Sequence, residues 1–539
     1  MSSFMTRRRV LGLIGSASLL HSSARRLFSE VTSGIGSRIP RFHAATATGR
    51  INDPQRPLWI NRCWNLWILW NKDFPDGRGT VWRRFTSKDL VHWAEQGTSI
   101  PKNTTPYGDV WTGSSVVDKA NTAGFGRDTV VALMTMPCKP MGGQGTGRWY
   151  SNDGGASFQF DSVVMTNPRA EDSNLRDKVF RDPNVRWHAP SQNWVMCLAE
   201  PGQIGFYRSS DLKSWKSSGS LKNAELGTLE CPNLFPLHLH DPDGKIAGEK
   251  WILLCGANGT ASEFTTGTHY WVGAFDGHNF QPDEGTGRWL DGGPDFYAAT
   301  AFSANSADPL ERTFVIAWMN NWNYADAVQQ KGYIGQLSVV RQLHLQLVDG
   351  TAILQNRPVE SVRSLSGANI LGKQQTISDK RDYDWPKGAA QTCCWIDLTM
   401  APVNGSWPES ISLLLRGGDG YSTQLGFKPV SGVAFLDREK CGPIPKEGDA
   451  WKARRSVPCN YSKSVSITIF LDLGSVEVFL NNGESTMSAL LTAPLDATAL
   501  RLTATGGQVS ISNVKIKQIG ATPNGERTKS LAIVDGVGD

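Results

Sequence analysis

Hydrophobic positions along most of the chain fall in short runs that are separated by polar, turn-forming residues. Four such runs cover residues 129–134, 194–198, 251–254 and 313–318. Runs this short, bounded by turn-forming residues, predict β-strands, because an amphipathic helix shows its period over a longer stretch. Glycine and proline number 55 and 28, and long stretches rich in Ala, Glu, Lys, Leu and Arg are absent. The pattern therefore predicts an all-β protein.

A short unit recurs between the hydrophobic runs. Residues 86–93 (TSKDLVHW) resemble residues 209–215 (SSDLKSW), and looser copies occupy residues 151–158 and 275–280. We interpret each copy as the end of a strand, an Asp-containing turn and an aromatic residue that packs back. Spacings of roughly 50 to 70 residues fit four-stranded blades with long loops. The repeat predicts a five-bladed β-propeller over residues 41–362.

After residue 362 the spacing of hydrophobic and polar positions changes. Hydrophobic and polar residues alternate strictly from Ser464 to Ile469, and residues 417–420 (GGDG) and 481–483 (NNG) are typical of tight turns. Alternation with a period of two predicts strands with one buried face, as in a β-sandwich. We therefore expect a linker and a C-terminal β-sandwich domain over residues 363–539.

The first 40 residues resemble a targeting segment. Arg7, Arg8 and Arg9 precede an apolar stretch over residues 10–20, and small residues follow at positions 22–24. This pattern is typical of a secretory signal peptide, and the paired arginines indicate twin-arginine export. The alternative is an N-terminal helix with a basic cap. We expect residues 1–40 to be a signal peptide and leader, and the protein to be exported to the periplasm or the outside.

Charge and composition narrow the classes of function. The net charge of +5 lies within the first 40 residues, so residues 41–539 are neutral overall. A neutral body argues against binding nucleic acid and suits an uncharged substrate. No apolar run reaches the roughly 18 to 20 residues of a membrane span. The nine His and nine Cys show no metal-ligand spacing. The 20 Trp offer flat faces for sugar rings, although core packing explains most of them.

Three acidic residues have similar surroundings. Asp53 (in INDP), Asp182 (in FRDP) and Glu230 (in LECP) are each followed by Pro within two residues. Proline fixes the local backbone and cannot donate to a strand ladder, which predicts strand ends or kinks facing the propeller channel. Each motif alone is more often a structural turn. Their separation, about one per successive blade, favours a shared site.

Paired carboxylates suggest glycoside hydrolysis. One carboxylate attacks the anomeric carbon, and one carboxylic acid protonates the leaving oxygen. We expect Arg181 to keep the neighbouring Asp182 ionised, which suits an acceptor for sugar hydroxyls. Glu230 lies in an apolar setting beside Cys231 and near Phe235. That setting suits a group that must be protonated to act as acid/base.

At these residues the chain resembles glycoside hydrolase family 32, the β-fructosidases, which include levanases, inulinases and invertases. The propeller motifs that carry the resemblance are Asn52-Asp53-Pro54, Val110-Trp111-Thr112-Gly113-Ser114, Arg181-Asp182-Pro183, Glu230-Cys231 and Trp318-Met319-Asn320-Asn321-Trp322. Leu436-Asp437-Arg438 and Ser475-Val476-Glu477-Val478-Phe479 are similar to the family's C-terminal sandwich. The resemblance therefore covers nearly all of residues 41–539.

The resemblance implies a retaining double displacement with no metal or organic cofactor. Asp53 is the expected nucleophile, Glu230 the acid/base, and Asp182 the group that stabilises the transition state. The residues expected to bind substrate are Asn52, Gln55, Trp70, Trp111, Thr112, Arg181 and Trp322. The expected function is that of a secreted, monomeric β-fructosidase that hydrolyses levan in exo fashion and also accepts sucrose or inulin.

Alternatives remain at this point. Residues 53–57 (DPQRP) resemble the levan fructotransferase branch, in which a fructan hydroxyl replaces water and a difructose anhydride forms. Gln55, Arg56 and Trp70 are where such an acceptor site is expected. A non-catalytic carbohydrate-binding protein is a second alternative, and an inverting propeller glycosidase acting on arabinan is a third. For the tryptophans, packing in the blade cores is the competing interpretation, above all for Trp322.

Overall fold

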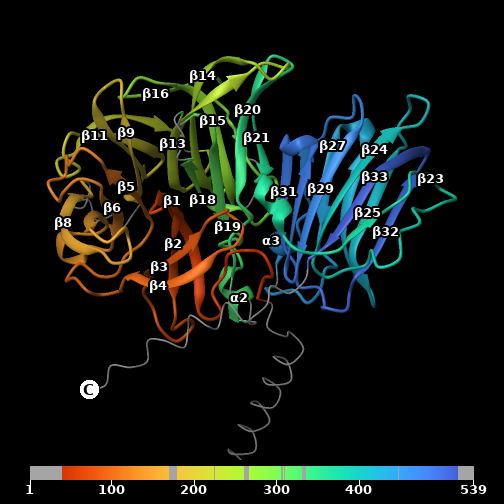
Figure 1. The fold of residues 1–539 in the computed structure, drawn as a ribbon, viewed down its shortest axis with the longest axis horizontal. Helices are drawn as coiled ribbons and strands as arrows, with labels where there is room; N and C mark the ends of the chain where they lie inside the picture. Colours follow the sequence, from red (N-terminus) through yellow and green to blue (C-terminus); the bar gives the residue numbers. More distant parts are fainter. Residues whose placement is uncertain are drawn as a thin grey trace, which may run out of the picture.

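The protein forms two β-rich bodies that lie side by side (Figure 1). The computed structural model describes residues 39–168, 179–223, 225–259, 266–304, 308, 310–330, 335–446 and 448–519. The strands of residues 50–358 build the first body, and those of residues 369–518 build the second. The predicted signal peptide lies outside the described residues. None of the described helices is long and apolar enough to cross a membrane.

The first body consists of five blades, and in each blade four antiparallel strands follow one another in chain order. Blade I contains β1 (Arg50–Ile60), β2 (Cys63–Asn71), β3 (Val81–Ser87) and β4 (Ala94–Ile100). Blade II contains β5 (Gly113–Asp118), β6 (Thr129–Met136), β7 (Gly145–Ser151) and β8 (Gln159–Thr166). Blade III contains β9 (Arg181–His188), β10 (Asn193–Glu200), β11 (Gln203–Ser209) and β12 (Lys216–Lys222).

The last two blades differ slightly from the first three. Blade IV contains β13 (Leu229–His240), β14 (Ile246–Ala257), β15 (Gly267–Phe275) and β16 (Phe280–Pro282), with β17 (Arg288–Trp289) paired to β15. Blade V contains β18 (Tyr297–Ser303), β19 (Thr313–Trp318), β20 (Arg341–Val348) and β21 (Thr351–Pro358). The end of β13 pairs in parallel with β20 at Leu239–Leu345 and His240–Gln346. This pairing joins blades IV and V into one nine-stranded sheet.

The first strand of every blade lies on the inside of a closed ring. Strand β1 contacts β5 and β18, β5 contacts β9, β9 contacts β13, and β13 contacts β18. The chain therefore closes a five-bladed propeller, as predicted. The four hydrophobic runs found in the sequence lie in β6, β10, β14 and β19, the second strands of their blades. Second strands are covered by neighbouring blades on both faces, so they read as continuous rather than alternating hydrophobic segments.

The recurring Asp-containing unit joins the third and fourth strands in blades I to IV. In blade I, Asp89 Oδ1 accepts hydrogen bonds from the backbone N–H groups of Val91 and His92 at 3.0 and 2.8 Å. In blade III, Asp211 Oδ1 accepts them from Lys213 and Ser214 at 2.8 and 2.7 Å. A short acceptor side chain that closes its own turn explains why aspartate recurs at this position.

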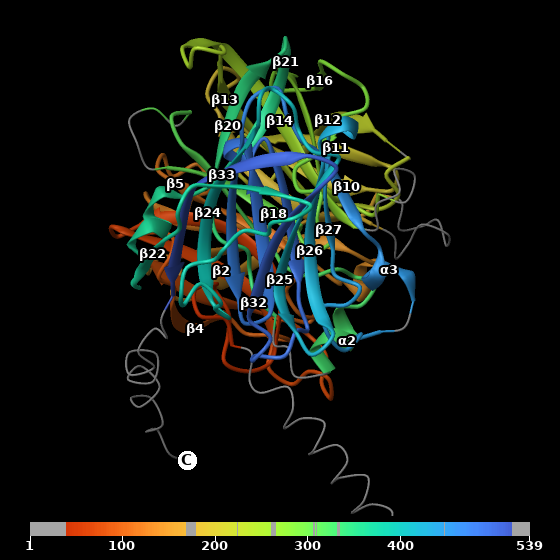
Figure 2. The same cartoon turned by 90° about the vertical axis from the view of Figure 1, so that its right-hand side faces the viewer.

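The second body is a sandwich of two antiparallel sheets (Figure 2). The larger sheet contains β22 (Asn369–Leu371), β23 (Gln375–Ser378), β24 (Cys394–Pro402), β29 (Val465–Asp472), β30 (Ser475–Leu480), β31 (Ser485–Leu490) and β33 (Gln508–Gln518). The smaller sheet contains β25 (Ser410–Gly418), β26 (Tyr421–Lys428), β27 (Val433–Asp437), β28 (Arg455–Pro458) and β32 (Ala499–Thr505). Val465, Ile467 and Ile469 point into the core between the sheets, as their alternation predicted.

Only short helices accompany the strands in the described parts of the chain. They are η1 (Lys139–Met141), α2 (Ala325–Gln330), η3 (Glu360–Ser364), η4 (Pro429–Ser431), α3 (Asp449–Lys452) and η5 (Asn481–Gly483). The predicted domain boundary at residue 362 falls in η3, between the last propeller strand and the first sandwich strand.

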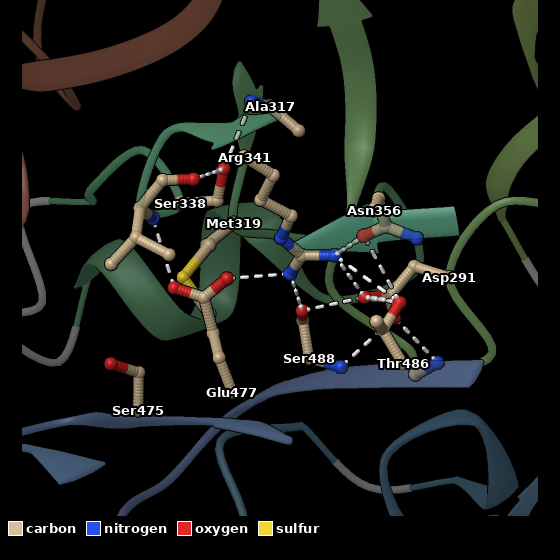
Figure 3. A network of polar contacts seen from close by, with 12 residues as sticks. Asp291, Ala317, Met319, Ser338, Arg341, Asn356, Ser475, Glu477, Thr486 and Ser488 are labelled. Atoms are coloured by element: carbon tan, nitrogen blue, oxygen red, sulfur yellow. Dashed lines mark hydrogen bonds and ion pairs between the residues drawn. The ribbon is translucent and has the colours of Figure 1, made fainter. Parts of the chain in front are cut away.

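A network of buried charges joins the two bodies (Figure 3). Arg341 on β20 lies at its centre, fully buried, with Nη1 2.8 Å from Asp291 Oδ2 and Nη2 2.5 Å from Glu477 Oε2. Glu477 Oε1 also lies 2.9 Å from Nε2 of His43, and Nδ1 of His43 lies 2.7 Å from Asp472. Buried charges are costly unless they are paired, so this network favours one relative position of propeller and sandwich.

A second buried ion pair supports the same interface. Arg438 Nη1 lies 2.6 Å from Asp295 Oδ2, and Arg438 Nη2 donates to the hydroxyl of Tyr324 at 2.5 Å. Two sandwich motifs carried the family resemblance, and Arg438 and Glu477 each belong to one of them. Each motif therefore contains a residue that pairs with the propeller.

Candidate active site

The three acidic residues singled out in the sequence lie near the beginnings of three innermost strands. Asp53 is on β1, Asp182 on β9 and Glu230 on β13. The pairing register shifts at this end of each strand: between Ile51 and Pro54, around Asp182, and between Glu230 and Asn233. Such bulges bend a strand and re-aim its side chains. The Pro residues after the acids sit within these shifts, where a missing backbone donor is tolerated.

Cys231 connects two of the carboxylates. Its backbone N–H donates to Asp182 Oδ2 at 2.9 Å, and its Sγ lies 3.6 Å from the same oxygen and 3.7 Å from Asp53 Oδ2. Asp182 and Cys231 both have a positive φ, of 63° and 48°. Such left-handed residues are uncommon outside glycine and concentrate at functional sites. The two carboxylates thus converge on one sulfur atom.

Asp53 is held by neighbours from other blades. Thr112, just before β5, donates its hydroxyl to Asp53 Oδ2, and Asp53 Oδ1 is buried without a hydrogen-bond partner among the described residues. Burial raises the pKa of Asp53 to about 6; the charge of Glu230 raises it as well, while the Thr112 hydrogen bond lowers it. Asp53 is therefore ionised at neutral pH and keeps one oxygen unengaged, as a nucleophile requires.

The environment of Asp182 qualifies one expectation. Burial raises the pKa of Asp182 above its ordinary value; Arg181 lowers it, and the charges of Glu230 and Asp53 raise it further. Arg181 thus favours the ionised form of Asp182, as expected, but burial outweighs the guanidinium in setting the direction of the shift. Arg181 also turns towards Glu230, with Nη2 2.8 Å from Oε1.

Glu230 has a polar rather than an apolar setting. Besides the ion pair with Arg181, Glu230 Oε2 accepts a hydrogen bond from the hydroxyl of Tyr297 at 2.5 Å. Burial and the neighbouring charge of Glu230 raise the pKa of Tyr297 well above its ordinary value, so its hydroxyl remains a donor. The predicted apolar surroundings of Glu230 were wrong, because Cys231 faces the other two acids instead.

Blade II contributes the backbone that supports this cluster. Thr135 on β6 donates its hydroxyl to the carbonyl of Thr112 at 3.0 Å and accepts from the backbone N–H of Asp182 at 2.7 Å. It therefore ties Thr112 to Asp182 across two blades. Trp111, beside Thr112, is half-buried, and its carbonyl accepts from Trp82 Nε1 at 3.0 Å.

Three residues of the predicted substrate and acceptor sites are turned into the propeller core. Gln55 is fully buried; its amide donates to the carbonyl of Asp53 at 2.9 Å and accepts from Gly113 N–H at 2.7 Å. Arg56 donates to Val185 and Asn184 in blade III. Trp70 is 8% exposed, and its Nε1 donates to the carbonyl of Thr48 at 2.8 Å. Gln55 and Trp70 were therefore wrong as sugar contacts, because their side chains are buried and bonded within the propeller, and the predicted acceptor residue Arg56 is engaged by blade III.

Asn52 and Trp322 lie together at the rim of the site. The ring of Trp322 is 44% exposed and packs against Trp318 with a centroid distance of 4.9 Å. The side chain of Arg50 joins the two, since Nε donates to Asn52 Oδ1 at 3.1 Å and the guanidinium lies 5.5 Å from the Trp322 ring. Trp322 is thus accessible rather than part of a blade core.

Sequence reasoning missed Tyr297, Thr135 and Arg50. Tyr297 is the first residue of β18, and the register of β18 shifts between Tyr297 and Thr300, as in the acid-bearing strands. The signal was available: blades I, III and IV each have an assigned acid near the start of the innermost strand, and blade V had no residue assigned at that position. Thr135 and Arg50 carry no sequence signal of their own.

Two further features were compared with this site: possible metal-binding clusters and a cavity. No group of three or more His, Cys, Asp and Glu placed to hold a metal ion occurs in the described ranges. A cavity of about 530 Å³ lies between blade V and the sandwich, lined by residues such as Gln342, Trp395, Thr468 and Asn513. None of Asp53, Asp182 and Glu230 borders this cavity.

Comparisons with known proteins agree with this architecture. The N-terminal domain model of glycosyl hydrolases family 32 matches residues 43–358, and the C-terminal model of the same family matches residues 362–518. The exo-inulinase crystal structure from Aspergillus awamori superposes with a TM-score of 0.78 at 27% identity, covering 90% of this chain and 98% of that one. These matches place the fold among glycoside hydrolases with a propeller and a sandwich.

Similar proteins of known name are fructan-degrading enzymes. A levanbiose-producing levanase of Bacillus subtilis (strain 168) is 34% identical over 485 residues, covering 88% of this chain and 90% of the relative. A levanbiose-producing levanase of Geobacillus stearothermophilus is 41% identical over 334 residues, covering 61% and 82%. The extracellular exo-inulinase of Aspergillus niger is 30% identical over 521 residues, covering 90% and 95%. The chain belongs to glycosyl hydrolase family 32.

Proposed function

We propose that this protein is an exported fructan hydrolase whose main substrate is levan, the β-2,6-linked fructan. The observation that carries the proposal is the convergence of three carboxylates from three blades, with Asp53 and Asp182 both within 3.7 Å of one Cys231 sulfur. The names of the relatives support a β-fructosidase acting on fructans, and two of them are levanases. A neutral body suits this uncharged polymer.

The chemistry is a double displacement. Asp53 attacks C2 of a fructosyl unit, the bond from C2 to the leaving oxygen breaks, and Glu230 protonates that oxygen. Water then attacks C2, Glu230 takes its proton, and Asp53 is released. Asp182 and Arg181 hold ring hydroxyls as positive charge develops on the sugar.

The surroundings of the carboxylates support these roles. Burial and the charges of neighbouring carboxylates raise the pKa values of Asp53 and Asp182. Asp53 keeps Oδ1 without a hydrogen-bond partner among the described residues, which leaves this oxygen for attack on C2. Glu230 is oriented by Arg181 and Tyr297, which suits a group that exchanges a proton with the leaving oxygen.

A further part of the proposal concerns whether levan is cut to fructose or to longer products. The sequence predicted exo release of fructose, whereas two relatives are named levanbiose-producing. We propose that levan is cut to short oligosaccharides in which the disaccharide is prominent. The fructosyl-transfer alternative relied on an acceptor site at Gln55 and Arg56. Their side chains are bonded within the propeller, so this support is lost. An inert binding protein is disfavoured by the retention of all three acids.

The test is to incubate the purified protein separately with levan, inulin and sucrose, and to identify products by chromatography and NMR. The proposal expects levan to be the best substrate and levanbiose to be the main product, with Asp53→Asn as the inactive control. Products from inulin or sucrose alone would refute the levan preference. A difructose anhydride would refute hydrolysis, and no product at all would refute the enzyme assignment.

Export is proposed separately. It rests on the Arg7-Arg8-Arg9 start with its apolar stretch and on relatives that are named extracellular. Fractionation of cells that express the whole chain should find the protein outside the cytoplasm. Replacing Arg7 and Arg8 by Lys should retain it inside; unchanged export would refute the twin-arginine route.

A further inference from the structure

Arg50 is the first residue of β1, three positions before Asp53, and it is held more firmly than a surface arginine. Its side chain is 13% exposed, and its Nη1 lies 2.6 Å from Asp326 Oδ1 on α2. Its Nε donates to Asn52 Oδ1 at 3.1 Å. Arg50 therefore links blade I to the segment after β19 in blade V, at the seam where the propeller closes.

Two aromatic rings lie against the guanidinium of Arg50. The centroid of Phe74, from the connection between β2 and β3, is 4.9 Å from its Cζ, and the centroid of Trp322 is 5.5 Å away. Cations at such distances from aromatic faces are attracted to the rings. The three side chains form one wall at the rim, in which an arginine lies between two aromatic faces.

One donor of this wall is unused. Arg50 Nη2 is buried and has no hydrogen-bond partner among the described residues. The same holds for Asp53 Oδ1 and Arg181 Nε in the acidic cluster. A buried polar atom without a partner costs roughly 1–3 kcal/mol, which a ligand hydroxyl can recover. Unpaired polar atoms that recur at neighbouring site residues point to a polar ligand that spans from the acids to the rim.

The position along β1 indicates which part of the ligand reaches Arg50. Arg50 and Asp53 are at most about 10 Å apart along β1, and the Asp53 charge acts on the Arg50 guanidinium, so one ligand can reach both side chains. Arg50 contacts Asn52 and Asp326, whereas Glu230, the proposed proton donor to the leaving group, is held by Arg181 and Tyr297. Arg50 and Glu230 thus share no partner among these contacts, which favours a place for Arg50 at the end of the site away from Glu230.

We propose that Arg50, Phe74 and Trp322 form a subsite for a second fructosyl unit, next to the unit bound at Asp53 and opposite the leaving group. The guanidinium donates to hydroxyls of that unit, while the aromatic faces cover its carbon-bound hydrogens. Arg50 is then a specificity-determining residue, because it sets the release of two units instead of one. This inference rests on the proposed fructan hydrolysis.

The experiment measures kcat, KM and products for levan oligosaccharides of three to six units. Arg50→Ala should raise KM about tenfold, equivalent to about 1.4 kcal/mol of binding. It should change kcat by less than about threefold and shift products from disaccharide towards free fructose. Arg50→Lys keeps the charge but loses the forked donors, so its KM should lie between those of wild type and Arg50→Ala.

The matched control is Arg454→Ala in the sandwich. Arg454 also lies over an aromatic ring, 4.6 Å from Phe435, and also pairs with a carboxylate, Asp437 at 3.0 Å. Its variant should keep the wild-type KM and products. A lower kcat at unchanged KM in Arg50→Ala, or an unchanged product pattern, would overturn the subsite. Failure of the wild-type protein to cleave any fructan would instead overturn the proposed function.

Discussion

The hydroxyl of Tyr297 donates a hydrogen bond to Oε2 of Glu230 across 2.5 Å. Glu230 Oε1 is meanwhile paired with Arg181 at 2.8 Å, so both oxygens of this carboxylate are engaged by neighbours from blades V and III. Two partners on a single carboxylate fix its orientation as well as its charge. Tyr297 thereby becomes part of the acidic cluster, although it carries no charge itself.

Replacing Tyr297 by Phe should lower kcat/KM by about tenfold or more, because the proposed acid/base loses one of its two positioning partners. Steady-state kinetics with levan measure this loss. Tyr207→Phe is the matched control, since the hydroxyl of Tyr207 donates to another buried carboxylate, Glu200, at 2.6 Å. An unchanged kcat/KM in the Tyr297→Phe variant would contradict this role.

Glu230→Gln should lower turnover of levan about 10²–10⁴-fold, the usual contribution of general acid–base catalysis. Asp53→Ala should lower it by several orders of magnitude, because no covalent intermediate can form. Both variants should keep the wild-type circular dichroism spectrum and melting temperature. Exposed Glu249→Gln controls for the Glu-to-Gln change itself. Near-wild-type turnover in either Asp53→Ala or Glu230→Gln would remove that residue from the mechanism.

The pKa of Asp53, raised to about 6 by burial, predicts the acid limb of activity. Below this pH the proposed nucleophile is protonated, so kcat/KM should fall as pH drops through about 6. Thr112→Val removes a donor to the carboxylate and should raise the pKa of Asp53, which moves the limb to higher pH. Thr146→Val is the control, because the Thr146 hydroxyl is buried without a partner among the described residues. A limb that stays in place in Thr112→Val would argue against Asp53 as its origin.

Glu477→Gln should destabilise the protein through the domain interface. Glu477 accepts from Arg341, from His43 and from the backbone N–H of Val339. The neutral amide in the variant no longer compensates the buried positive charges of Arg341 and His43. This should lower the unfolding free energy by about 3–5 kcal/mol. Chemical denaturation measures the loss of unfolding free energy. Exposed Glu409→Gln in the same domain should change it by less than about 0.5 kcal/mol, and an equal effect of both variants would contradict the interface argument.

His43 predicts how this interface responds to alkaline pH. Burial alone would lower the pKa of His43, but hydrogen bonds to Asp472 and Glu477 raise it from 6.5 to about 9. A raised folded-state pKa means that this contribution to stability is fully present below pH 6.5 and is lost as pH rises through about 9. Melting temperatures should therefore fall between about pH 6.5 and 9 and level off above about pH 9. The fall should be shallower in His43→Gln; an equally steep fall would assign it to other groups.

Much of the fold could be predicted from the sequence, because those features depend on residues that are close together in the chain. The second-strand runs are hydrophobic on both faces, and Asp89 and Asp211 close their own turns, so both features leave local patterns. The joining of blades IV and V left no such pattern, because it depends on two residue pairs between β13 and β20. Gln55 and Arg56 were misassigned for a related reason. The bulge in β1 decides which residues face the channel, and motif spacing does not reveal it.

The sequence by itself determined the all-β class, the two-part architecture and the three acids, because strand period, turn chemistry and Asp-Pro motifs are encoded within a few residues. Only the tertiary structure decided the partners of those acids. Cys231 meets Asp53 across 178 positions of sequence, Tyr297 meets Glu230 across 67, and Glu477 meets His43 across 434. Such contacts exist only after five blades close into a ring and dock on the sandwich, since burial and pairing there depend on the whole packed chain.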